Sequence, residues 1–97
     1  MAEILLSAAA DADLHGVLAH GEENFGWPAA EAYYDSFEEA FDLLKRHPRI
    51  GPEAFPGSSA IRVLRHRRHR LFYEVRGNEI LIIRILHHAM DAGRRLG

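Results

Sequence analysis

Large apolar residues follow two different periods along this chain, and the period changes near residue 60. Within residues 28–46 they recur at spacings of three and four, the repeat of one face of an α-helix; these residues are Tyr33, Phe37, Phe41 and Leu44. Beyond residue 60 apolar and polar residues alternate, as in a strand with one buried face. The pattern therefore predicts a helical first part and a second part that forms a sheet.

A short strand and a first helix are expected ahead of this periodic segment. Residues 3–6 form an apolar run, and Ser7 after it is suited to cap the start of a helix. Gly21 is expected to end that helix, because glycine favours the conformation found at helix C-termini. The buried face of the helix would consist of Ala10, Leu14, Val17 and Leu18.

The second helix is expected to be continuous. It begins near Pro28, since proline suits the first helical turn, and closes at Lys45-Arg46-His47-Pro48, where positive charge precedes a helix breaker. Its apolar face should place Phe37 and Phe41 between the helix and the sheet. Residues 49–59, which are punctuated by proline and glycine, are predicted to form an ordered loop.

Three strands joined by short turns are expected in the second part. Residues 61–63 alternate, residues 71–75 are rich in β-forming side chains, and Gly77-Asn78 marks a tight turn into residues 79–86. The last strand is apolar on both faces over residues 80–83, so it should be central, with the N-terminal strand on its free side. The predicted fold class is α+β: an N-terminal strand and a helical hairpin packed on an antiparallel sheet, with a C-terminal three-stranded meander. The remaining residues have room for at most a short helix.

Length and composition favour one domain over residues 1–97, since a chain of 97 residues that is 47% hydrophobic can bury its own core. Cysteine is absent, which excludes disulfides, thiolate metal sites and cysteine nucleophiles. The serines, including Ser58 and Ser59, lie outside nucleophile motifs, and no glycine-rich phosphate loop occurs, so no cofactor is expected. The acidic start does not suit a signal peptide, and no apolar run approaches the roughly 20 residues that span a bilayer. We therefore expect a cytoplasmic location and no membrane partner.

Charge is distributed unevenly. Residues 1–60 carry eleven Asp and Glu against three Lys and Arg, whereas residues 61–97 carry nine Arg against three acids. Five of these arginines fall within residues 62–70, and arginine grips phosphates and carboxylates with a planar fork. Such a surface favours an anionic partner, either a nucleic acid backbone or an acidic protein segment. Two plainer interpretations are that the halves neutralise each other across the fold, and that charge protects an edge strand from aggregation.

Seven histidines invite a test for metal binding. His66 and His69 are three apart, and His87 and His88 are adjacent, so regular strand geometry would aim the two side chains of each pair at opposite faces. Neither pair then forms a chelate, and no zinc-binding helix motif is present. No metal site is expected.

Several runs of residues carry a resemblance to a known family. They are Phe25-Gly26-Trp27, His47 to Gly51, Arg68 to Val75, and Ile83 to Asp91. In this order of elements the chain resembles the RelE/ParE superfamily of toxins from bacterial type II toxin–antitoxin pairs, and the last run is similar to the ParE branch. The resemblance implies a toxin that arrests growth, stabilises plasmids and inhibits DNA gyrase by binding, without catalysis. It also implies a hetero-oligomer with a ParD-like antitoxin whose acidic C-terminal segment wraps the toxin.

The resemblance and the charge pattern together predict a surface for the target or the antitoxin. Its expected residues are Arg62, Arg65, Arg68, Arg70, Arg84, His87, Met90, Asp91, Arg94 and Arg95. The rival interpretation is a ribosome-dependent messenger RNA endoribonuclease similar to RelE, in which Arg70 and Arg84 hold phosphate and His87 or His88 supplies the base. The second arginine of RelE-type members falls at Met90 here, and the C-terminal aromatic position falls at Leu96 or is lost. The set for RNA cleavage is thus incomplete, and a third interpretation is an antitoxin-binding remnant without toxicity.

Overall fold

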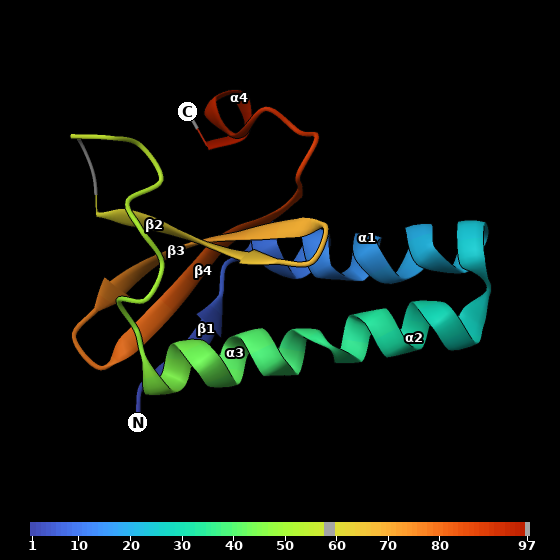
Figure 1. Ribbon diagram of the computed structural model, residues 1–97, viewed down its shortest axis with the longest axis horizontal. Coiled ribbons are helices and arrows are strands. Elements are labelled where there is room, and N and C mark those ends of the chain that lie inside the picture. The colour runs from blue at the N-terminus through green and yellow to red at the C-terminus, as the bar shows by residue number, and fades with distance from the viewer. Residues whose placement is uncertain (58–59, 97) are drawn as a thin grey trace.

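The computed structural model describes residues 1–57 and 60–96, and it forms two layers, one of helices and one of strands (Figure 1). Predictions for Ser58, Ser59 and Gly97 lie outside the described residues. Among the residues described, no helix has the length and apolar character needed to cross a membrane. The elements in chain order are β1 Glu3–Leu6, α1 Ala8–Phe25, α2 Trp27–Asp35, α3 Phe37–Arg46, β2 Ile61–His66, β3 His69–Arg76, β4 Glu79–His87 and α4 Ala92–Leu96.

The sheet has the strand order β1-β4-β3-β2, so the last strand is central as its apolar character predicted. Strands β2, β3 and β4 form the expected antiparallel meander, whereas β1 joins β4 in parallel. The Ser7 backbone N–H extends this pairing by donating to the Ile82 carbonyl at 2.9 Å. The α+β fold class is confirmed, with one parallel strand in an otherwise antiparallel sheet.

Helices α1, α2 and α3 lie on one face of the sheet, with α1 antiparallel to α2 and α3, whereas α4 lies apart from them near the C-terminus (Figure 1). Ser7 caps α1 as predicted, because its side chain accepts a hydrogen bond from the Ala10 N–H at 3.0 Å. Phe37 is 1% exposed in the core between α3 and the sheet, whereas Phe41 is only partly buried at its margin. The buried core consists of Ala10, Leu14, Val17, Phe37, Ala40, Leu44, Leu71, Tyr73, Ile80, Ile82 and Ile85.

The prediction that Gly21 ends the first helix is wrong. Helix α1 continues to Phe25 and ends at Gly26, whose φ of 85° lies in the left-handed region that glycine tolerates. Gly21 instead lets the two helices approach, since a Cβ there would lie 3.1 Å from the Ala30 Cβ. A glycine within a helix costs only about 1 kcal/mol, which close packing can offset.

The second helix is divided in two at Ser36, and the prediction of one continuous helix is wrong at that position. The Ser36 hydroxyl contacts the Tyr33 carbonyl at 2.5 Å and the His66 ring at 2.8 Å. A serine side chain that bonds the backbone one turn back competes with regular helical hydrogen bonding. The break therefore coincides with a contact to the sheet.

The loop after α3 is fixed against the outer edge of β2. Ala54 donates its N–H to the Ile61 carbonyl at 2.9 Å, and Val63 donates to the Pro52 carbonyl at 3.0 Å. Gly51 donates its N–H to the buried Tyr73 hydroxyl at 3.0 Å. A Cβ at Gly51 would lie 2.5 Å from the Val63 carbonyl oxygen, so the loop depends on glycine at this position.

Candidate interaction surface

The turn between β2 and β3 presents arginines toward solvent. Arg65, Arg67 and Arg68 are exposed, and Arg67 has a φ of 53° that turns the chain between the two strands. Arg65 lies directly opposite Arg70 in the strand register, and like charges in that position repel each other. We call Arg65, Arg67, Arg68 and Arg70 the basic hairpin. Its repulsion would be relieved by a bound anionic group.

Arg70 also connects this hairpin to the C-terminal tail. Its Nη2 donates to the Met90 carbonyl at 2.5 Å, and its guanidinium lies 5.3 Å from the centre of the Phe72 ring. The Arg70 Nε is buried without a hydrogen-bond partner. His88 adds a second link, because its N–H donates to the Arg68 carbonyl at 2.8 Å. The structure thus brings together four predicted residues, Arg68, Arg70, Met90 and the adjacent Arg65.

Arg84 is not available in the same way. Its Nε and Nη2 donate to the two carboxylate oxygens of Asp13 at 2.7 and 2.9 Å, and the Ile85 N–H also donates to that carboxylate at 2.9 Å. Hydrogen bonding to Asp13 raises the pKa of Arg84 above its usual value. The pair is mostly buried, with 21% of the Arg84 side chain and 15% of the Asp13 side chain exposed. Arg84 therefore joins α1 to the edge of β4 where β1 ends.

Arg62 stabilises the loop after α3 by hydrogen bonding to its backbone, so its guanidinium is not free on the surface. Its Nη1 donates to the Gly51 carbonyl at 2.7 Å and to the Arg49 carbonyl at 3.3 Å. Arg94 lies 3.9 Å from Asp91 in an exposed pair, and Arg95 contributes its carbonyl to Arg84 at 3.3 Å. Among the described residues, the side chains of Arg62, Arg94 and Arg95 make no hydrogen bond or ion pair with the basic hairpin.

His66 and His69 connect the sheet to the helices through side-chain hydrogen bonds. The prediction that His66 and His69 point to opposite faces is wrong, because they are partners across the turn and both reach the helical layer. The His66 Nε2 lies 2.8 Å from the Ser36 hydroxyl, and the His69 Nδ1 lies 2.7 Å from the Tyr33 hydroxyl. Within residues 1–57 and 60–96, no three histidine or carboxylate groups are placed to hold a metal ion.

Burial determines the protonation state of the histidines between the sheet and the helices. Desolvation, aided by the neighbouring His87 and His66 rings, lowers the pKa of His69 to about 4. Burial likewise lowers the pKa of His66, with a further contribution from Arg67, and desolvation lowers the pKa of His87. The imidazoles are therefore neutral near pH 7 and act in packing and hydrogen bonding.

Sequence reasoning missed three residues that organise this region: Asp13, Tyr33 as a hydrogen-bond partner, and Ser36. A signal for Asp13 was present, because a carboxylate one turn after Ala10 and next to Leu14 borders the apolar stripe of α1. A charged residue at such a border requires a partner if it becomes buried. The signal for Tyr33 and Ser36 was weaker, since their partners are more than 29 residues away in the chain.

Direct neutralisation between the two halves is limited. Within the described part of the chain, two ion pairs join them: Arg84 with Asp13 and Arg67 with Glu39 at 3.9 Å. The second pair is exposed and long, so it contributes little. Ion pairing between the acidic and the basic half is therefore weak among the described residues, apart from the Arg84–Asp13 pair.

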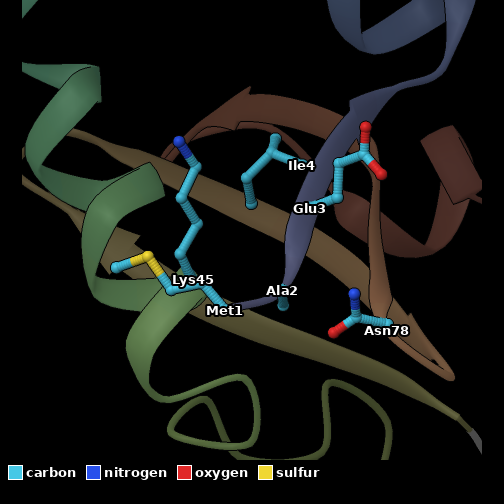
Figure 2. Close-up of a pocket in the computed structure, with 6 residues that line it drawn as sticks. All are labelled: Met1, Ala2, Glu3, Ile4, Lys45 and Asn78. Carbon is cyan, nitrogen blue, oxygen red and sulfur yellow. The ribbon is translucent and has the colours of Figure 1, made fainter.

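A shallow hollow lies at the opposite end of the sheet from the basic hairpin. It has a volume of about 440 Å³ and is lined by Met1, Ala2, Glu3, Ile4, Lys45 and Asn78. Figure 2 shows Lys45 of α3 and Ile4 of β1 on its sides, with Asn78 of the β3–β4 turn at its margin. It contains no histidine and none of the predicted site residues.

Comparison with known proteins agrees with this geometry. The chain is 34% identical over 93 residues to Toxin ParE1 of Mycobacterium tuberculosis, covering 95% of each chain. It is 30% identical over 92 residues to Toxin ParE1 of Caulobacter vibrioides, again covering 95% of each. Among solved structures, a chain of the chromosomal ParDE system from P. aeruginosa superposes with a TM-score of 0.77 at 22% identity, covering 90% of this chain and 96% of that one. A chain of the RelBE2 complex of M. tuberculosis gives a TM-score of 0.64 at 24% identity, with 89% and 96% covered.

The family model for ParE toxins of type II toxin–antitoxin systems matches residues 4–92, which include all of the sheet except the first residue of β1, the whole helical hairpin and the start of the C-terminal tail. The match extends well beyond half of the chain, and the resemblance seen in the sequence is confirmed. This chain belongs to the ParE toxin family of type II toxin–antitoxin systems.

Proposed function

We propose that this ParE-family chain arrests bacterial growth by binding and inhibiting DNA gyrase, without cleaving a substrate. The observation that carries the proposal is the engagement of Arg84, whose guanidinium is held by both carboxylate oxygens of Asp13. In the rival nuclease interpretation, the Arg84 guanidinium would have to be free to hold a phosphate and stabilise its extra negative charge. Inhibition by binding has no such requirement.

The rival function has one point in its favour. His87 has a lowered pKa and is therefore neutral near pH 7, as a general base must be. Its ring lies 4.3 Å from the His88 ring and 5.4 Å from the His69 ring, at the side of the sheet that faces the helices. Arg68 is the arginine whose charge lowers the pKa of His87 further, and Arg70 of β3 uses part of its hydrogen-bonding capacity on the Met90 carbonyl. A base beside Arg68, with Arg84 held by Asp13, lacks the second guanidinium of the rival mechanism.

We further propose that a ParD-like antitoxin neutralises the chain by placing its acidic C-terminal segment on the basic hairpin and the tail. Arg65, Arg67 and Arg68 are exposed there, and Arg70 lies opposite Arg65, so carboxylates would relieve an existing repulsion. The solved relative from P. aeruginosa, whose fold is similar, is part of a ParDE toxin–antitoxin system. A toxin–antitoxin hetero-oligomer is the expected resting form.

Two assays with purified protein and induced cells distinguish inhibition from RNA cleavage. Purified toxin should inhibit supercoiling by gyrase, whereas primer extension on messenger RNA after induction should show no new ends. The variant with His87→Gln and His88→Gln lacks both candidate bases but keeps polar side chains of similar size. It should retain most of the growth arrest, and a loss of about 100-fold with the fold and antitoxin binding intact would establish cleavage instead.

A further inference from the structure

Two aromatic side chains are exposed at the corner between α1 and α2. Phe25 is 64% exposed and Trp27, the only tryptophan of the chain, is 47% exposed. Among the described residues, neither ring stacks on another aromatic ring or on a guanidinium. Figure 1 shows that this corner extends past the end of the sheet, and neither side chain is part of the hydrophobic core.

The corner is held in one conformation by backbone contacts. Gly26 donates its N–H to the Glu22 carbonyl at 3.2 Å, and Ala30 donates to the Gly26 carbonyl at 3.1 Å. The close approach of Gly21 to Ala30 holds the two helices together one turn away. Aromatic side chains on a rigid corner lose little conformational entropy when a partner covers them.

The charge around these rings has one sign. Glu22, Glu23 and Glu31 are exposed next to them, and residues 1–44 contain no lysine or arginine. In the part of the chain that the structure describes, none of these three carboxylates lies within ion-pair distance of a cation. We call Glu22, Glu23, Phe25, Trp27 and Glu31 the acidic tip. It combines aromatic anchors with unpaired negative charge.

We infer that the acidic tip is the surface by which this toxin contacts its target protein, and that the target presents lysine or arginine side chains around an apolar depression. Tryptophan and phenylalanine are frequent anchors of protein interfaces, and the face of a tryptophan ring attracts cations. The surrounding carboxylates would favour such a partner and steer its approach. The inference rests on the proposal that the chain acts on a protein, and gyrase is suited to it because enzymes that handle DNA carry basic surfaces.

The tip and the basic hairpin differ in charge and place, so the target and the antitoxin would be recognised by different chemistry. An acidic antitoxin segment is repelled by Glu22 and Glu23 and attracted by Arg65 and Arg68. The other possible occupant of the tip is the basic hairpin of a second copy of this chain. Gyrase inhibition and the mass of the chain in solution distinguish a target protein from a second copy at the tip.

The test compares a tip variant, Phe25→Ser with Trp27→Ala, with a control variant, Ile50→Ala. Ile50 is 49% exposed beyond the end of α3, so the control also removes an exposed apolar side chain, but from a different region. A third variant, Glu22→Gln with Glu23→Gln, removes charge and keeps the rings. Each is measured for growth arrest at matched expression, inhibition of purified gyrase, affinity for the cognate antitoxin, and mass in solution by sedimentation.

The tip variant should need about tenfold or more protein for half-maximal gyrase inhibition and should no longer arrest growth. The charge variant should show a smaller loss that shrinks further in high salt, and the control should match the wild type. Unchanged growth arrest by the tip variant would overturn the inference. So would weakened antitoxin binding, a shift from dimer to monomer, or a wild-type chain that arrests nothing.

Failure of the gyrase proposal gives a different result. The wild type would then arrest growth without inhibiting gyrase, while the tip variant would still lose arrest and keep antitoxin affinity. That outcome would retain the tip as the target contact and redirect the search to another protein with a basic surface. Circular dichroism and thermal unfolding of each variant establish that a loss of activity is not a loss of fold.

Discussion

The acidic tip and the basic hairpin are both turns that extend from the core, yet their charged side chains are used differently. Within the basic part, Arg62, Arg70 and Arg84 donate to carbonyls or to a carboxylate of the same chain. At the tip, Glu22, Glu23 and Glu31 form no ion pair among the described residues. A cluster of charged residues in the sequence therefore does not show how many of those side chains are free to bind a partner. A dense basic run can be partly structural, and a sparse acidic corner can be wholly free for a partner.

The largest expected effect comes from Phe37, whose buried ring packs against His66 at the base of the basic hairpin. Its ring lies 4.8 Å from the His66 ring and 5.7 Å from the Tyr33 ring in a site that is 1% exposed. Phe37→Ala should lower the free energy of unfolding by about 3–5 kcal/mol, as measured by urea denaturation. Phe41→Ala on the same helix should cost clearly less, because Phe41 is only partly buried. Equal losses would show that the two rings are packed alike.

A smaller loss is expected when the bond between α1 and β4 is removed. Asp13→Ala leaves the guanidinium of Arg84 and the Ile85 N–H without their carboxylate, and we expect a loss of about 3 kcal/mol in unfolding free energy. Asp11→Ala is the control. Asp11 lies on the same helix, but its side chain is exposed and its ion pair with His15, at 3.7 Å, is also exposed and therefore weak. That change should remain within about 0.5 kcal/mol. A comparable effect of both substitutions would refute the structural role of Asp13.

Acidification should loosen the basic hairpin before it affects the tip. The pKa of His69 is about 4 in the folded protein and 6.5 unperturbed, so the unfolded chain binds more protons between these values. Stability is therefore complete above pH 6.5 and falls as the pH drops toward 4, by about 2 kcal/mol after allowance for solvent screening.

Chemical denaturation across this pH range measures the slope, and His69→Gln should make it shallower. An identical slope in the variant would assign the pH dependence to other groups. Trp27 fluorescence offers a parallel measurement at the tip, where no change is expected until global unfolding.

The smallest effect concerns the rate at which the antitoxin associates. Arg65→Gln with Arg68→Gln should slow association several-fold, on the order of threefold to tenfold at low ionic strength, with little difference at high salt. Arg62→Gln is the matched control, because Arg62 donates to the Gly51 and Arg49 carbonyls. Surface-immobilised antitoxin gives both rate constants. A slowing by Arg62→Gln as large as that of the double variant would remove the distinction between free and engaged arginines.

The fold was largely predictable from local pattern. The β-forming side chains of residues 71–75, the turn at Gly77-Asn78 and the two-sided apolar character of residues 80–83 predicted the meander and its central strand. The structure contains both. The helical stripe around Phe37 and the cap at Ser7 were equally clear. Each of these features depends on residues a few positions apart, so the sequence carries the information directly.

The errors arose where distant residues meet. Gly21 stays within a helix because Ala30 packs against it, and the second helix divides at Ser36 because the side chain bonds to His66 as well as to its own backbone. The two histidines of the hairpin point the same way because a two-residue turn makes them partners. Local propensity is weak compared with such contacts.

The sequence by itself determined the order of elements, the family, and the division of charge at residue 60, since all three depend on the identity and spacing of residues along the chain. Only the tertiary structure decided which charges are free. Arg84 and Asp13 are 71 positions apart and become an ion pair only when α1 packs beside β4, whereas Phe25 and Trp27 stay exposed because the helical hairpin extends past the sheet. The availability of a side chain is set by the groups that folding brings to it, and those groups lie far away in the chain.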